Sequence, residues 1–428
     1  MKIAQMMVLL RIFIVGLWLG SPLSAHSQIK DPNPAVNNPD KFAWDLFIEV
    51  NRPALEGKRG VPDPSKRPGD PGLRVWETWK ITSTNGNEVF LQNGARPSPW
   101  EDVKAKLDGK YIKLLSPPKM NIIKGNLAND PHFDLARSVP KLNELGQESR
   151  INQVGFDFIL NENLYSLDGQ ERFRKTQRKV EFPIGTINVK ATWRQFTRKE
   201  IEAGVPNRFY TAADDKSIWG LTGFHMTSKD LPNWFWATFE HAENPSPEIP
   251  DRDRHTKFRN PRSSTGVFVE QRLREVPGSL KGSYWENYVL RGTQVDFIDS
   301  TGSPTILGNT QLENGMQTTS SCMGCHARST IGDRLDDIVI NGRRVYPNGT
   351  YLYPSGRLSG GANRLTVNPA QVAWQQDPQN PDPSTASFHV TGAIGAPNPE
   401  WFTDSAGRSR YTQLDFIWAF IHAERETN

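Results

Sequence analysis

The sequence predicts a mixed α and β fold that is rich in loops, with a β-rich middle and helices near both termini. Three observations predict this class. Apolar residues recur at helical spacing after residue 38 and again after residue 414, and they alternate with polar residues between residues 187 and 193. Proline and glycine are both abundant, with 32 and 34 residues, which favours many turns.

The composition is that of a globular protein. The chain has 428 residues, of which 36% are hydrophobic and 23% charged, so it is long enough for one large domain or two smaller ones. The formal net charge is +4 and the charges are not gathered in long blocks of one sign, so nothing in the balance indicates a nucleic-acid partner. No stretch is convincing as a linker, and we expect residues 28–428 to form a single large unit.

The N-terminus has the pattern of a secretory signal. Lys2 and Arg11 give a basic start, the apolar run 12–19 follows, and small residues including Ala25 and Ser27 come next. The run is far shorter than the roughly 20 residues that span a bilayer. We therefore expect residues 1–27 to be a cleaved signal peptide, the mature chain to be periplasmic or otherwise exported, and no stable membrane span. An uncleaved anchor is the alternative.

The first helix is expected from residue 39 to just before Pro53. Asn38 is a good capping residue, Pro39 suits the first helical position, and Asp40 lies where the helix end attracts negative charge. Apolar residues at helical spacing follow: Phe42, Ala43, Leu46, Phe47 and Val50. A polar loop over 54–73 and a short helix over Pro99–Leu107 are predicted after it.

The sequence pattern in the middle of the chain predicts strands. The alternation over 187–194 predicts one strand, and the aromatic-rich segments 218–227 and 234–241 predict a hairpin. Further short strands are expected at 284–298 and 345–353. At the C-terminus, apolar residues at helical spacing predict one helix: Leu414, Phe416, Ile417, Trp418, Phe420 and Ile421.

The clearest chemical signal is Ser-Cys-Met-Gly-Cys-His-Ala at residues 321–327. C-x-x-C-H is the signature of covalent haem attachment. On one helical turn, the thiols of Cys322 and Cys325 can reach the two vinyl groups at one edge of a porphyrin, and His326 then projects its imidazole under the iron. We therefore predict an attachment helix at 322–326 that carries one covalent haem c, with His326 as the proximal iron ligand.

Two other chemical uses of this motif are possible. A thioredoxin-like redox pair expects a βαβ setting, whereas the region before Cys322 is polar and shows no strand pattern. A zinc site would need two further ligands, which a distant pair such as His225 and His241 could supply. The export signal, the histidine directly after Cys325 and the lack of any other cysteine favour haem.

With these residues the chain resembles c-type cytochromes. More loosely, it is similar to long single-haem cytochrome c family proteins of bacteria, in which a W-x-x-F-E-H segment (Trp236–His241 here) precedes an S-S-C-M-x-C-H-A segment (Ser320–Ala327 here). The resemblance implies the cofactor and little else, because no settled activity comes with that group. Small cytochromes c wrap one haem with about a hundred residues, so the extra length here needs a reason, such as a substrate pocket or a docking surface.

The second axial ligand is not marked by any local motif. If the hairpin forms, His241 shares a face with Phe235, Ala237 and Phe239, an apolar wall with one nitrogen donor that suits a porphyrin. His241 and Met226 are therefore the tentative distal ligands, with His225 and Met316 behind them. A core histidine bonded to a backbone carbonyl is the plainer alternative for His241.

Glu240 is a second candidate in this segment, as an acid–base group beside an open iron site. Strand alternation instead points it away from the His241 face. For Lys190 and Arg194 a solvated strand face is the plain interpretation, and contact with the haem propionates is the alternative.

The expected function is periplasmic electron transfer through one haem c, with a redox partner protein or a small-molecule donor or acceptor as partner. The alternative is a haem c enzyme that oxidises a small molecule or reduces peroxide at an open iron. A gas or redox sensor is the third candidate function. An electron carrier needs two protein ligands on the iron, whereas an enzyme or sensor needs an open or displaceable position.

Overall fold

The structure is a computed structural model, and it describes residues 34–83, 85–102, 145–176, 179–213, 217–244, 276–298, 302, 304–311, 321–327, 329–332, 338–340, 343–345, 372–375, 387–390, 396 and 411–427. Within these ranges the fold is mixed α and β, as the sequence predicts. The expected signal peptide, residues 1–27, lies outside them. None of the helices in these ranges is both long and apolar enough to cross a membrane.

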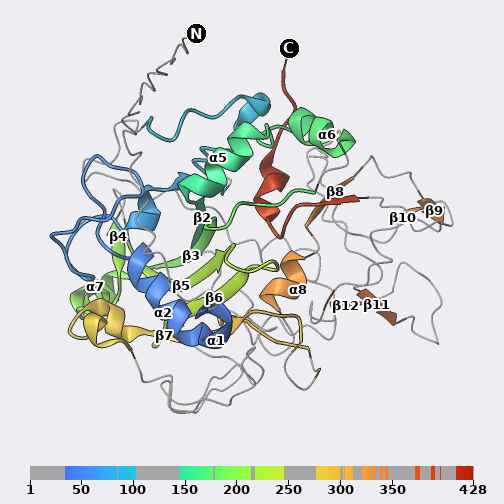
Figure 1. Cartoon of the computed structure of the whole chain (residues 1–428). Coiled ribbons are helices and arrows are strands. Elements are labelled where there is room, and N and C mark those ends of the chain that lie inside the picture. Colours follow the sequence, from blue (N-terminus) through green and yellow to red (C-terminus); the bar gives the residue numbers. More distant parts are fainter. Residues whose placement is uncertain are drawn as a thin grey trace, which may run out of the picture.

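A seven-stranded sheet dominates the structure (Figure 1). Its main order is β1-β2-β3-β5-β6-β7, and β4 pairs with β5. All of its pairings are antiparallel. The strands are β1 (Lys80–Ile81), β2 (Leu145–Ile151), β3 (Ile187–Gln195), β4 (Thr211–Ala213), β5 (Ile218–Ser228), β6 (Phe235–His241) and β7 (Tyr288–Gln294).

The predicted strands of the middle segment are confirmed. The apolar members of the alternation in β3 are all buried, and β5 and β6 form the expected antiparallel hairpin, with Phe224 opposite Phe239 and His225 opposite Thr238. The strand expected at 284–298 is shorter, because Tyr284–Asn287 form a 3-10 helix before β7 begins. Of the strand expected at 345–353, only Val345 falls in the described residues, as the last residue of β10 (Arg343–Val345).

Helix α2 (Pro39–Val50) covers one face of the sheet, which we call the α2 face. The Asn38 side chain accepts a hydrogen bond from the Lys41 backbone N–H at 3.3 Å, so the predicted cap is confirmed. Phe47 of α2 stacks on Phe239 with ring centroids 4.3 Å apart, and Thr293 of β7 bonds to Asp40. The α2 face therefore carries the odd-numbered residues of β6, and it holds the aromatic core.

The other helices flank the sheet. They are α1 (Pro34–Asn37), α5 (Gln153–Asn161), α6 (Leu167–Lys175), α7 (Arg198–Glu202) and α8 (Cys322–His326), with 3-10 turns at Val75–Thr78, Gln92–Gly94, Val205–Arg208 and Gly278–Leu280. In the predicted helix over Pro99–Leu107, residues 99–102 form a turn and the remainder lies outside the described residues. The described residues also form three two-stranded antiparallel sheets. They pair β13 (Tyr411–Gln413) with β8 (Thr330–Gly332), β10 with β9 (Ile338–Ile340), and β11 (Val372–Gln375) with β12 (Ser387–Val390).

The predicted C-terminal α-helix is wrong. Residues 411–413 form strand β13, and only Trp418–His422 are helical, as a short 3-10 turn. Between them, Asp415 and Phe416 have φ values of 47° and 69°, a left-handed backbone that interrupts an α-helix. Leu414, Ile417 and Phe420 are all buried, as their apolar spacing suggests, but they lie in the turn after β13 and in the 3-10 turn instead of in an α-helix.

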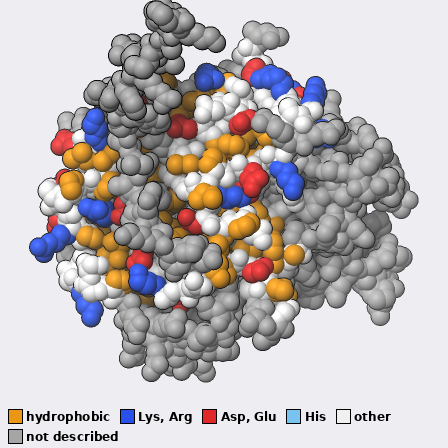
Figure 2. Space-filling model, viewed as in Figure 1, with side chains coloured by type: hydrophobic (Ala, Val, Ile, Leu, Met, Phe, Trp, Pro, Cys, Tyr) orange, Lys and Arg blue, Asp and Glu red, His pale blue; other side chains and the backbone are white. Residues whose placement is uncertain are grey.

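Charges are mixed on the molecular surface that Figure 2 shows. Basic and acidic side chains are interspersed there with hydrophobic ones, and neither sign dominates the described part of that face. This agrees with the small net charge of the chain.

Candidate cofactor site

The C-x-x-C-H motif forms the short helix α8, as the sequence predicts. Ser321 precedes it as the capping residue, and its hydroxyl accepts a hydrogen bond from the Gly324 N–H at 2.9 Å. Because a helix of five residues is weak by itself, it needs anchoring from outside. Gln294 of β7 provides this: its side-chain oxygen accepts from the Met323 N–H at 3.0 Å, and its nitrogen donates to Ser321 at 2.7 Å.

These contacts place α8 on the face of the sheet opposite α2, which we call the α8 face. Gln294 is the register partner of Trp236, and the Trp236 ring lies 4.7 Å from the His326 ring between centroids. The α8 face therefore carries Trp236, Thr238 and Glu240 of β6. Figure 1 shows α8 beside β6, with the C-terminal segment coloured red close to it.

His326 is held by a backbone carbonyl from the C-terminal segment. Its Nδ1 lies 2.7 Å from the carbonyl oxygen of Phe416. A carbonyl can only accept, so Nδ1 carries the proton, and in the neutral imidazole the lone pair is then on Nε2. Histidines that bind metals through one nitrogen commonly donate the other N–H to a carbonyl in this way.

The two cysteines lie on the single turn of α8. The Cys322 side chain is partly buried and its Sγ lies 3.6 Å from the carbonyl oxygen of Leu307. The backbone of Cys325 is part of the same helix, whereas its side chain lies outside the described ones. Two thiols on one turn next to an imidazole with a fixed tautomer are a donor set that fits a covalently attached haem.

His225 lies on the α8 face, near His326. Its register partner on β6 is Thr238, two residues along the same face from Trp236, and its Nε2 lies 3.3 Å from the Thr238 hydroxyl. Burial lowers the pKa of His225 well below its usual range, and the charges of Lys190 and His326 lower it further. The imidazole is therefore neutral at physiological pH, the form that binds a metal.

His241 lies on the α2 face, beyond the reach of the motif. Its ring stacks on Phe209 at 3.5 Å, its Nε2 lies 2.9 Å from the Arg208 carbonyl oxygen, and its Nδ1 accepts from the Glu243 N–H at 3.2 Å. Both ring nitrogens thus have backbone partners, as in an ordinary core histidine. Burial is the main cause that lowers its pKa to about 4.

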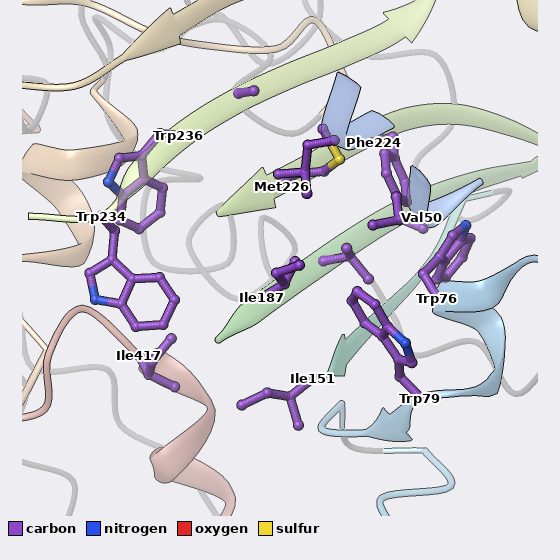
Figure 3. Close-up of a cluster of buried hydrophobic side chains, with 14 of the residues drawn as sticks. Val50, Trp76, Trp79, Ile151, Ile187, Phe224, Met226, Trp234, Trp236 and Ile417 are labelled. Carbon is purple, nitrogen blue, oxygen red and sulfur yellow. The ribbon is translucent and has the colours of Figure 1, made fainter. Parts of the chain in front are cut away.

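Met226 also lies on the α2 face. It is 1% exposed, and its register partners are Val189 of β3 and Ala237 of β6. Figure 3 shows its sulfur among core side chains on the side of Phe224 and Val50, whereas Trp236 lies at the other end of the cluster. Neither tentative distal ligand is therefore brought to the motif, because the hairpin presents both on the face away from α8.

Glu240 points to the α8 face, as strand alternation predicts. It is fully buried and paired with Arg291, and its carboxylate also accepts hydrogen bonds from the Thr310 hydroxyl and from the Thr310 N–H at 3.1 Å. Asn309 beside it donates to the Thr238 hydroxyl at 3.0 Å. Glu240 thus fastens residues 304–311 over the sheet, which is a structural role.

The alternative uses of the motif find little support. His225 and His241 lie on opposite faces of the hairpin, so they cannot complete one zinc site with the cysteines. In the ranges that the structure describes, no group of three or more His, Cys, Asp or Glu side chains could hold a metal ion. Every named strand pairing is antiparallel, so the described elements give α8 no βαβ setting.

Met316, the last of the distal candidates named from the sequence, lies outside the described residues. Sequence reasoning missed Gln294 and the carbonyl of Phe416, whereas Ser321, a favoured capping residue directly before the motif, could have been found.

No protein-family model, curated protein or solved structure matches the chain. Any function must therefore rest on the residues of the site itself.

Proposed function

We propose that this chain is an exported, periplasmic c-type cytochrome that transfers electrons through one haem c. Cys322 and Cys325 would hold the haem by thioether bonds, and His326 would be its proximal ligand. The observation that carries the proposal is the hydrogen bond from His326 Nδ1 to the Phe416 carbonyl. It gives the histidine of a C-x-x-C-H motif the tautomer and the orientation that an iron ligand needs.

The distal side of the proposed haem is assigned to His225, in place of His241 and Met226. His225 is on the same face as Trp236, which packs against His326. If His225 and His326 both bound the haem iron, no position on it would remain open to a substrate or a gas. That arrangement suits electron transfer better than the open site of an enzyme or a sensor.

A haem bound here would supply reversible one-electron chemistry at its iron. The protein's own residues then have three tasks. Gln294 and Ser321 fix the attachment helix, Phe416 orients His326, and the buried Trp236 lies against the imidazole and keeps water from that side. Burial of this kind, with the hydrogen bond to the ligand, is what sets a haem potential.

Absorption spectra of the ferric and dithionite-reduced protein, with and without carbon monoxide, test this function. An electron carrier should be low-spin in both states and should not change when carbon monoxide is added. A high-spin spectrum with immediate carbon monoxide binding would contradict electron transfer and support the open-site haem enzyme instead.

A further inference from the structure

A buried ion pair joins the β5–β6 link to the segment that contacts His326. Lys229 directly follows β5, and its Nζ lies 2.7 Å from Asp415 Oδ1, with both side chains 7% exposed. Lys229 also donates to the Pro232 carbonyl at 2.9 Å, and Asp415 Oδ2 accepts from the Phe182 N–H at 2.7 Å. The carboxylate thus ties three separate segments together.

Asp415 begins an unusual turn. Asp415 and Phe416 both have a positive φ, a conformation that side chains with a Cβ disfavour and that persists only when the surroundings impose it. On one side, the Leu414 N–H bonds to the Ser329 carbonyl at 2.9 Å. On the other side, the contacts of Asp415 with Lys229 and Phe182 hold the turn. The turn directs the Phe416 carbonyl to His326 Nδ1.

We propose that Lys229 and Asp415 are a positioning pair for His326, which tunes the reduction potential of the bound haem through the Phe416 carbonyl. This inference rests on the proposed haem function. Nothing in the hydrogen bond of Phe416 to His326 requires a buried ion pair, and a salt bridge in this setting adds little stability compared with apolar packing. Asp415 of this ion pair directly precedes Phe416, so the pair can fix the position of the carbonyl that accepts from His326.

The direction of the effect follows from the hydrogen bond. A firm Nδ1–H···O contact increases the basicity of the imidazole, which stabilises the ferric iron more than the ferrous iron. Loss of the ion pair relaxes the 415–416 turn, so the carbonyl moves and the contact weakens. The reduction potential should then become more positive.

The test is the midpoint potential of the mature holoprotein, measured by redox titration, with the Asp415→Asn variant compared with wild type. We expect the equilibrium constant for reduction to rise about tenfold, in line with the effect of disturbing a residue that hydrogen-bonds to a metal ligand. For one electron, this tenfold change equals a shift of about 59 mV in the midpoint potential. Asp415→Asn keeps an acceptor for the Phe182 N–H and removes only the charge that pairs with Lys229.

The matched control is Glu148→Gln. Glu148 and Arg150 also form a buried ion pair, 2.9 Å long and at most 2% exposed, but on β2, away from α8 in the strand order. Glu148→Gln should lower stability by a similar amount and change the equilibrium constant less than twofold. The double variant Lys229→Met/Asp415→Asn should regain stability and still show the raised potential.

Equal potentials for Asp415→Asn and Glu148→Gln would overturn the inference. If Asp415→Asn does not fold, Asp415→Glu is measured in its place, because the glutamate keeps the negative charge and its extra methylene displaces the turn. An unchanged midpoint potential in Asp415→Glu would also overturn the inference. Failure of the haem function itself is separate: the wild type would then carry no covalent haem, and no potential could be measured for any variant.

Discussion

The Nδ1 atom of His326 lies 2.7 Å from the carbonyl oxygen of Phe416, 90 residues further along the chain. This contact joins the attachment motif to the C-terminal segment. The same segment is joined to the motif's neighbourhood by β8 and β13, and by the Ser329 hydroxyl, which donates to the Ile417 carbonyl at 2.7 Å. The position of the histidine is therefore a property of the whole fold and not of the five-residue helix.

The first prediction concerns the distal ligand. His225→Ala should turn a low-spin spectrum high-spin and open the iron to carbon monoxide, because it removes the second of the two proposed histidine ligands and leaves His326. His241→Gln and Met226→Leu are matched controls, since both residues lie on the α2 face. They should leave the spectrum unaltered. A spectrum that changes with Met226→Leu or His241→Gln, and not with His225→Ala, would remove His225 from the site.

The second prediction concerns Glu240. Glu240→Gln should reduce the free energy of unfolding by about 3–5 kcal/mol, because it leaves the buried Arg291 without its counter-charge. Denaturant titration followed by circular dichroism measures it. The covalent haem and its potential should be nearly unaffected. Loss of a catalytic activity at unchanged stability would instead restore Glu240 as an acid–base residue.

The third prediction is a pH dependence of stability due to His241. Its pKa is about 4 in the folded protein and 6.5 for an ordinary histidine, so the unfolded chain takes up the proton first as the pH falls. Stability is therefore full above about pH 6.5 and is lost towards pH 4, by about 3 kcal/mol from this group.

The matched variant for that measurement is His241→Gln, whose amide can still donate to the Arg208 carbonyl but does not titrate. Unfolding free energies at pH 7 and pH 4.5 should differ less for this variant than for wild type. Identical pH dependence in the two proteins would show that His241 is not held neutral by burial.

Local signals in the sequence predicted the fold where local interactions decide it. Asn38 and the apolar spacing after it specify α2, and the alternation from Ile187 specifies β3. The C-terminal segment has a helical pattern as well, but its backbone partners are distant in sequence. The Leu414 N–H bonds to Ser329, and Asp415 bonds to Lys229, so tertiary contacts replace the helix by a strand and a turn.

The candidate site was predicted in part for a related reason. Alternation placed His241 and Glu240 correctly on opposite faces of β6, but no local pattern tells which face receives α8. An apolar face suits a porphyrin, so the sequence favours the face of His241. The structure covers that face with α2 and leaves the face of His225 and Trp236 to the motif. The Phe416 carbonyl has no sequence signal at all, because any residue could provide it.

The most direct measurement is the intact mass of the purified mature protein, made in a host that attaches haem c, under denaturing conditions. We predict the mass of the chain without its signal peptide plus one haem, which stays with the protein through acid–acetone extraction. The Cys322→Ala/Cys325→Ala variant should show the mass of the polypeptide alone. A wild-type mass without haem, or a haem that persists in the doubly substituted protein, would contradict covalent attachment at this motif.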